Sequence, residues 1–130
     1  MAKLSYDLVS PERKLASGEA DSVQLPGQEG DMTALPNHAP VVTTLRPGVV
    51  TVREGGVTLD YVVTGGFAEL AGTTVAVLAE EAVKREDVTA DWLAAKLKAA
   101  EALHEIAEGE AKILAALRVN DFKFLAAQMN

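Results

Sequence analysis

The side chains best placed to carry chemistry lie in the first third of the chain, at Glu29, Asp31 and His38. On an extended segment Glu29 and Asp31 would share one face, which is the arrangement of an acid pair. His38 would then supply the base of a small hydrolase. The simpler interpretation is two solvated loop carboxylates beside a buried histidine that anchors the loop through a hydrogen bond. We favour this interpretation, so the sequence predicts no catalytic residues.

Composition argues against several other kinds of site. The chain has no cysteine and only two histidines, His38 and His104, so a metal cluster lacks ligands. Residues 27–30 lack the lysine and the hydroxyl of a phosphate-binding loop. The formal net charge of −7 argues against nucleic acid and against an anionic lipid surface. No leader-like or membrane-spanning apolar run is seen, so we expect a soluble, cytoplasmic protein without direct lipid insertion.

These acidic residues and His38 lie in a turn-rich segment, residues 27–48, where prolines and glycines separate short extended pieces. From Leu4 to about Ala82, short alternating or β-branched runs are separated by glycine-containing turns. The expected strands are residues 4–9, 20–25, 41–45, 49–53, 57–64, 67–70 and 74–78. Glu54–Val57 is typical of a hairpin turn. Many short strands at this spacing predict an antiparallel sandwich or barrel.

After Ala79 the pattern becomes helical. Residues 88–130 contain no proline and one glycine, Gly109, and are rich in strong helix formers. Thr89 or Asp87 is suited to cap the first helix, and Gly109 to end it at a tight turn. The expected apolar stripes are Leu93, Leu97, Ala100, Leu103 and Ala107, then Ile113, Leu114, Leu117, Phe124 and Leu125. The sequence therefore predicts an α+β fold: an N-terminal antiparallel β-sandwich, residues 1–87, followed by a C-terminal two-helix antiparallel hairpin, residues 88–130.

The hairpin is expected to need support from another surface. Ordering its residues costs more conformational entropy than two facing helices recover by burying apolar area. We therefore expect it to dock on the sandwich or on another protein, and to be held only marginally. Trp92, near its start, is expected to be a packing residue rather than a stacking platform for a ligand.

Several segments carry distinctive motifs: Leu8–Glu12, Gly18–Glu19, Val23–Gly27, Glu29–Gly30, Leu35–Pro40, Leu45–Gly48, Gly65–Phe67 and Val77–Ala79. Together they resemble the epsilon-subunit family of bacterial F-type ATP synthases, which corresponds to the delta subunit of mitochondria. Pro-Asn-His-Ala-Pro followed by Leu-Arg-Pro-Gly is a specific signature, and the match covers nearly all of residues 4–83. The architecture of the family, a β-sandwich and a helical hairpin, agrees with the fold predicted from the residues.

The resemblance implies a non-catalytic rotor subunit of the central stalk, without a cofactor, which passes rotation of the proton-carrying c-subunit ring to the catalytic head. It implies a peripheral position in the complex, at the cytoplasmic face of the bacterial plasma membrane. The residues carried over to the ring contact are Glu29, Gly30, Asp31 and Met32, whose acids would meet basic ring loops. His38 is carried over to the contact with the gamma subunit.

For the hairpin, the resemblance implies two kinds of regulation. Some relatives bind ATP through a motif that opens the first helix, but Thr89 and Trp92 stand here where the motif has Asp and Arg. We therefore predict no ATP binding, and a nucleotide-sensing module with the hairpin as an ATP-operated latch is the alternative. In relatives the second helix can extend into the head and inhibit ATP hydrolysis through basic residues. The candidates here to face acids of the alpha and beta head subunits are Lys112, Arg118 and Lys123.

Overall fold

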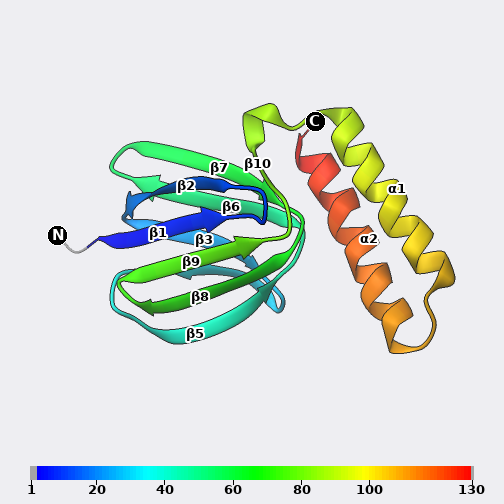
Figure 1. Cartoon of the computed structure of the whole chain (residues 1–130), viewed down its shortest axis with the longest axis horizontal. Coiled ribbons are helices and arrows are strands. Elements are labelled where there is room, and N and C mark those ends of the chain that lie inside the picture. The colour runs from blue at the N-terminus through cyan, green and yellow to red at the C-terminus, as the bar shows by residue number, and fades with distance from the viewer. Residues whose placement is uncertain (1–2, 130) are drawn as a thin grey trace. The chain divides into compact units, whose positions relative to one another are not determined.

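The structure is a computed structural model that describes residues 3–129 (Figure 1). Its strands are β1 (Leu4–Val9), β2 (Lys14–Ala20), β3 (Ser22–Gly27), β4 (Gly30–Ala34), β5 (His38–Leu45), β6 (Gly48–Glu54), β7 (Val57–Val63), β8 (Gly66–Gly72), β9 (Thr74–Ala79) and β10 (Ala82–Lys84). A 3₁₀ turn (Arg85–Asp87) and the helices α1 (Ala90–Ile106) and α2 (Glu110–Met129) follow. The chain divides into two compact units, one ending at Arg85 and one beginning at Glu86.

The strands join into one sheet that folds over into a nearly closed sandwich. Its strand order is β10-β7-β6-β3-β5-β8-β9-β1-β2, with β4 paired to β3. The antiparallel β-sandwich followed by a helical hairpin is thus confirmed as the fold class. One pair among the described strands differs, because β1 runs parallel to β9, with Leu8 opposite Val77. This pairing joins strands about 70 residues apart in sequence, so no local turn signal predicts it.

The hydrophobic core lies inside the sandwich. In β1 the side chains of Leu4, Tyr6 and Leu8 are buried, whereas Ser5 and Asp7 between them are exposed. This period of two is what a strand with one buried face requires. The cluster continues through Val23, Leu25, Leu45, Val50, Val52, Tyr61, Val63, Leu70, Val75 and Val77. Burial of these side chains is the main source of the stability of this unit.

The segment of residues 27–48 is more regular than the sequence predicts. It holds the end of β3, all of β4 and all of β5, with turns at residues 28–29 and 36–37. The strands β2, β4 and β10 were not predicted. β2 is rich in small and polar residues, so its extended form derives from pairing with β1, for example Ala16 with Leu8, rather than from its own propensity.

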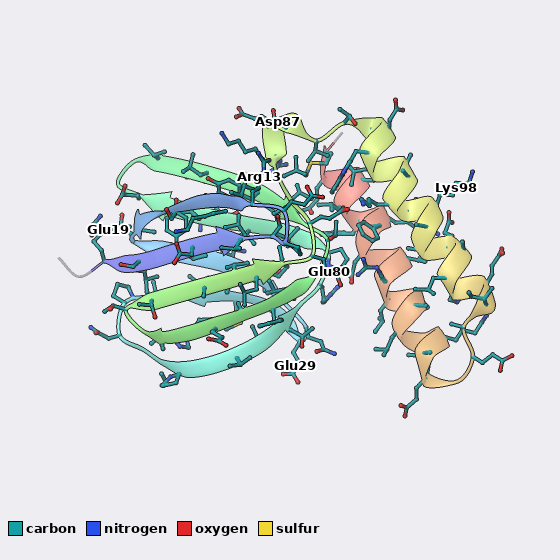
Figure 2. All side chains as sticks on the ribbon, viewed as in Figure 1. Arg13, Glu19, Glu29, Glu80, Asp87 and Lys98 are labelled. Atoms are coloured by element: carbon teal, nitrogen blue, oxygen red, sulfur yellow. The ribbon has the colours of Figure 1, made fainter. Side chains whose placement is uncertain are left out.

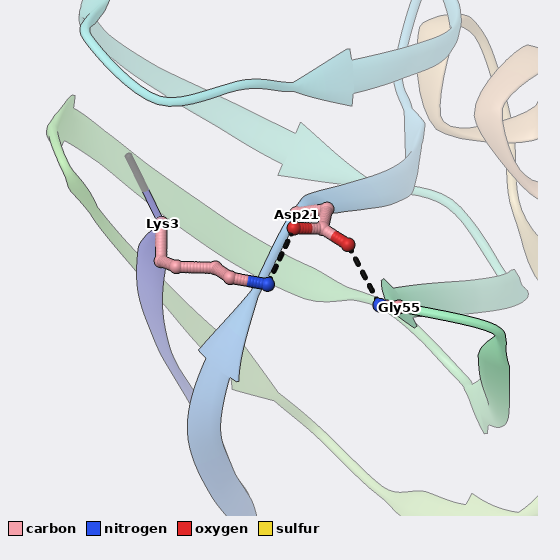
Figure 3. A network of polar contacts seen from close by, with 3 residues as sticks. All are labelled: Lys3, Asp21 and Gly55. Atoms are coloured by element: carbon pink, nitrogen blue, oxygen red, sulfur yellow. Dashed lines mark hydrogen bonds and ion pairs between the residues drawn. The ribbon is translucent and has the colours of Figure 1, made fainter. Parts of the chain in front are cut away.

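A polar network ties the start of the chain to two turns of the sandwich (Figure 3). The carboxylate of Asp21, between β2 and β3, accepts hydrogen bonds from Lys3 Nζ at 2.6 Å and from the Gly55 N–H at 2.7 Å. The bond from Lys3, supported by the bond from Gly55, lowers the pKa of Asp21 below its ordinary value. The same bond to Asp21 raises the pKa of Lys3. One carboxylate therefore joins three segments that are distant in sequence.

The two helices form the predicted hairpin, in which α1 packs against α2. Thr89 caps α1, because its Oγ1 accepts the N–H of Trp92 at 3.0 Å. Ala107 rather than Gly109 caps the end of α1, so the predicted role of Gly109 is wrong. Gly109, with φ of 62°, lies just before α2, and its carbonyl accepts the N–H of Lys112 at 3.1 Å. The glycine shapes the start of the second helix instead of the end of the first.

The buried faces of the helices depart from the predicted stripes. Leu93, Ala100 and Leu125 are buried as predicted. The stripe residues that are exposed instead are Leu103, Ile113, Leu114, Leu117 and Phe124. In α2, Ala115 and Phe122 are buried together with Leu125, and their spacing puts all three on one helical face. A small alanine thus occupies the buried position that the pattern assigned to larger residues. The docking of the hairpin on another surface stays a prediction.

Candidate functional site

A depression of about 700 Å³ lies on the surface of the sandwich, between the β3–β4 turn and β5. Residues 27–32 form one wall and residues 41–44 form the other. All four residues predicted for the ring contact, Glu29, Gly30, Asp31 and Met32, therefore line the same feature. The β5 wall was not predicted, because it needs the long-range placement of β5 beside β3 and β4.

Backbone hydrogen bonds hold the two walls together. Gly27 and Gly30 pair across the two-residue turn that joins β3 to β4, and Gly27 also pairs with Leu45 of β5. The N–H of Gln28 donates to the carbonyl of Thr44 at 2.9 Å. A Cβ on Gly27 would lie 2.8 Å from the Gly30 carbonyl oxygen, so this crossing needs a residue without a side chain. The turn is therefore fixed on a rigid scaffold, which suits a contact surface.

The rim of the depression is acidic and exposed. Glu29 lies in the turn itself and its side chain projects outward from the sandwich (Figure 2). Asp31 is exposed on β4, whereas Met32 is half-buried and packs against the core. The structure does not form the extended acid pair that was the less favoured alternative, because Glu29 is in a turn and does not alternate with Asp31 along one strand. Two solvated carboxylates on a fixed turn suit contact with a basic partner surface.

His38 begins β5, away from the residues that line the depression. It is half-buried, and its Nδ1 lies 2.7 Å from the carbonyl oxygen of Ala39, to which it donates in the tautomer with the proton on that nitrogen. Across the sheet His38 is opposite Gly72 of β8. The predicted buried anchor is thus only half-buried, and its hydrogen bond is to the neighbouring residue.

The three basic residues predicted to face the head lie in different surroundings on α2. Lys112 Nζ donates to the carbonyl of His104 at 3.0 Å, which satisfies a carbonyl in the last turn of α1. The guanidinium of Arg118 lies 5.2 Å from the ring centre of Phe122. Lys123 is exposed. At about 100° per residue, Lys112 and Lys123 project to nearly the same side of an ideal helix, and Arg118 projects about 120° away.

The start of α1 shows what the residues at the ATP-motif positions do here. Thr89 caps the helix, and the half-buried Trp92 has Lys96 Nζ 5.4 Å from the centre of its ring. Within residues 3–129 there is no group of three His, Asp or Glu side chains placed to hold a metal ion. The described helices are also too short or too polar to cross a membrane.

Residues 3–85 match the family described as the ATP synthase delta/epsilon chain, β-sandwich domain. An ATP synthase epsilon chain of Rhodobacter capsulatus is 48% identical and aligns over 98% of this chain and 96% of its own. The epsilon chain of Fuscovulum blasticum is 54% identical over 76% of this chain and 78% of its own. The epsilon chain of Bradyrhizobium sp. strain ORS 278 is 39% identical over 100% of this chain and 96% of its own.

Solved structures share the whole fold. A chain of the Euglena gracilis mitochondrial ATP synthase, solved as OSCP/F1/c-ring, has a TM-score of 0.77 and 26% identity, with 100% of this chain and 83% of that chain covered. A chain of the Tetrahymena thermophila mitochondrial ATP synthase, from the central stalk and c-ring, has a TM-score of 0.67. At 18% identity over 97% and 95% of the two chains, this second likeness concerns the fold alone.

Fold and surface together define a protein of the β-sandwich and helical-hairpin class, with an exposed acidic turn on the sandwich. The chain belongs to the ATP synthase delta/epsilon chain family. The resemblance drawn from its motifs is thereby confirmed.

Proposed function

We propose that the chain is a central-stalk subunit of a proton-translocating F-type ATP synthase, which couples rotation of the ring to ATP synthesis in the head. The observation that carries this proposal is membership of the epsilon-chain family over nearly the full length of both chains. The subunit itself is non-catalytic and acts through its contacts. It works as a peripheral part of the complex, on the cytoplasmic face of the bacterial plasma membrane.

The contact with the c-subunit ring is assigned to the depression at the β3–β4 turn. Glu29 and Asp31 supply negative charge at its exposed rim, while Gly30 and Met32 shape the turn and the floor. Acidic side chains on a fixed turn complement basic loops electrostatically and orient the two surfaces. His38, on the same strand as the far wall, is assigned to the contact with the gamma subunit.

The hairpin, residues 88–130, is assigned a modulating role in ATP hydrolysis at the alpha and beta head subunits. Lys112, Arg118 and Lys123 are the cations available for such a contact, and Lys112 must first leave the carbonyl of His104.

Deletion of residues 88–130 is expected to raise the ATPase rate of the assembled complex. An unchanged rate would contradict this role. Titration of ATP into the isolated protein is expected to give no binding at millimolar concentration.

The proposal as a whole is tested by size-exclusion chromatography with the purified gamma subunit. Both the full chain and residues 1–87 are expected to co-elute with gamma at equal stoichiometry, because the sandwich carries its own core. If only the full chain bound, the hairpin would belong to the gamma interface. If neither bound, the assignment to the central stalk would fail.

The ring contact is tested by Asp31→Lys, with Glu12→Lys as the matched control. Both side chains are exposed, but Asp31 lines the depression and Glu12 lies in the β1–β2 turn. Asp31→Lys sets a cation against a basic loop, so we expect ATP hydrolysis to rise severalfold relative to proton pumping in membrane vesicles. Glu12→Lys should leave the ratio unchanged. Equal behaviour of the two variants would argue against a ring contact at this turn.

A further inference from the structure

We propose that β10 and the ion pair Arg85–Asp60 form a clasp that sets the length of the tether between the sandwich and the hairpin. The clasp is defined here as β10 together with Arg85, Asp60 and Thr51. When the clasp is closed, the tether to the hairpin begins after Arg85. When it is open, the tether begins after Glu81. This inference uses only contacts within the first unit, and it does not rest on the proposed function.

The first observation is the register of β10. This three-residue edge strand pairs with β7, and its last pair is Lys84 with Tyr61. One more step in the same register brings Arg85 opposite Asp60. There the Arg85 Nη1 lies 3.2 Å from Asp60 Oδ2. The ion pair therefore continues the ladder by one position, at the point where the strand itself ends.

The second observation is that Asp60 is held from its other side. Its Oδ1 accepts a hydrogen bond from Thr51 Oγ1 at 2.8 Å, and the two residues are paired across β6 and β7. The side chain of Asp60 is 27% exposed and that of Arg85 is 42% exposed. Both carboxylate oxygens thus have a partner, which orients the group towards the passing chain. The clasp spans β6, β7 and β10.

The third observation is where the first unit ends. The boundary between the two units falls directly after Arg85. Glu86 and Asp87 are exposed, and Thr89 already caps α1. The residue just before the clasp, Glu81, is held separately, because its carbonyl accepts a hydrogen bond from the Thr64 N–H at 3.2 Å. Only residues 86–88 then join a closed clasp to the helix cap.

Opening the clasp lengthens the tether by the residues from Ala82 to Arg85. An extended chain spans about 3.3–3.6 Å per residue, so four residues add about 13–14 Å of reach. A short edge strand is the kind of element that opens locally without unfolding the domain. The hairpin therefore has two ranges of movement, selected by a contact that belongs to the sandwich.

The clasp brings its own reporter, because Lys84 and Arg85 are trypsin sites inside it. The experiment is limited trypsin digestion of the full chain, comparing the natural protein with Asp60→Asn and with Asp7→Asn. Asp7 of β1 forms an exposed ion pair with Lys14 of β2 at 3.1 Å, and neither strand is part of the clasp, so its loss is the matched control. Mass spectrometry follows the cleavage rate after residues 84 and 85.

Removing an exposed ion pair shifts a local equilibrium by a few-fold, and cleavage follows the open population when reclosing is fast. Asp60→Asn is therefore expected to accelerate cleavage after Lys84 and Arg85 by roughly two- to fivefold, with other sites unchanged. Asp7→Asn should leave these two sites as they are. Unchanged cleavage in Asp60→Asn would overturn the proposal, and so would equal acceleration at every tryptic site, which would indicate general destabilisation instead of a local clasp.

Discussion

The sandwich and the hairpin differ in where their large apolar side chains lie. In the sandwich, aliphatic side chains from nearly every strand meet in one buried cluster. Among residues 88–129 of the hairpin, only Leu93, Phe122 and Leu125 are large apolar residues with less than a tenth of their surface exposed. The large apolar residues that are more than half exposed there are Leu103, Ile106, Ile113, Leu114, Leu117 and Phe124. The sandwich is stabilised from within, whereas the hairpin presents apolar surface to its surroundings.

The two regions also differ in how their contacts span the sequence. The sandwich joins its first strand to its ninth and its third to its sixth. The hairpin joins two helices that are neighbours in sequence. Long-range pairings make a unit cooperative, and contacts between neighbouring elements allow it to open and close locally. We therefore expect the sandwich to unfold as one unit and the hairpin to open more readily.

The largest effect is expected from Gly66→Ala, which breaks the sandwich. Gly66 pairs with Ala79 at φ of 130°, and a Cβ there would lie 2.1 Å from the carbonyl oxygen of Leu78. The backbone of β9 must move, so the free energy of unfolding should fall on the order of 3–5 kcal/mol. Denaturant titration measures the loss. Gly56→Ala is the control, since a Cβ at Gly56 meets nothing within 4 Å.

The expected result is a change of less than about 1 kcal/mol for Gly56→Ala. Amide hydrogen exchange then locates the damage from Gly66→Ala. It should appear across the strands of the sandwich, and α1 and α2 should keep their protection. A parallel loss of protection in the helices would show that the sandwich and the hairpin unfold together.

A second effect is expected from one chemical change made at two positions of α2. Leu125 is 1% exposed and Leu117 is 53% exposed. Leu125→Ala should destabilise the hairpin by about 2–4 kcal/mol, whereas Leu117→Ala should cost less than about 1 kcal/mol. Amide exchange of residues 110–129 in the full chain measures both. Equal effects would mean that Leu117 is covered in solution, so the hairpin would not expose the apolar surface described above.

How far the fold follows from the sequence is shown by its strands. β1, β7 and β9 were predicted within a residue or so, because their apolar residues alternate or cluster between glycine turns. β2, β4 and β10 were missed, since their residues have little strand propensity and are extended only by their neighbours. The same limit applies to the depression. Its acidic turn is visible as a motif, but its β5 wall depends on long-range pairing.

For the helices, the sequence predicted the elements themselves but not the face that each of them buries. Composition and capping residues predicted both helices and offered Thr89 or Asp87 as the first cap, of which Thr89 is the one that caps α1. The buried face was mispredicted, because periodicity ranks residues by hydrophobicity and Ala115 is buried where Leu114 and Leu117 are not. A helix rich in alanine offers several faces of similar character, so packing rather than pattern selects one of them. The sequence therefore indicates that a helix exists more reliably than which side of it is covered.

The smallest effect is expected from a change of pH, which alters the stability that the network of Lys3, Asp21 and Gly55 gives to the sandwich. The pKa of Asp21 is lowered by Lys3, so its stabilisation is present above the ordinary carboxyl pKa of about 3.9 and is lost as the pH falls through the lower folded value. The pKa of Lys3 is raised by Asp21, so its stabilisation is present below about 10.4 and is lost as the pH rises through the higher folded value. Asp21→Asn should therefore lower the denaturation midpoint slightly between these limits, with no effect below the lower one and a smaller effect above the upper one, where the Gly55 N–H still donates to Asp21.

Lys3→Gln distinguishes the two bonds of the network. In this variant residue 3 carries no charge at any pH, so the network no longer loses stability as the pH rises past the pKa of a lysine. The Gly55 N–H still donates to Asp21, so part of the acid dependence should persist. Urea midpoints measured from pH 2.5 to pH 11 separate the variants, because the surface exposed on unfolding, and hence the slope, is the same in each. If Lys3→Gln showed no more acid dependence than Asp21→Asn, the bond from Gly55 would contribute nothing, and Asp21 would join two segments of the sandwich instead of three.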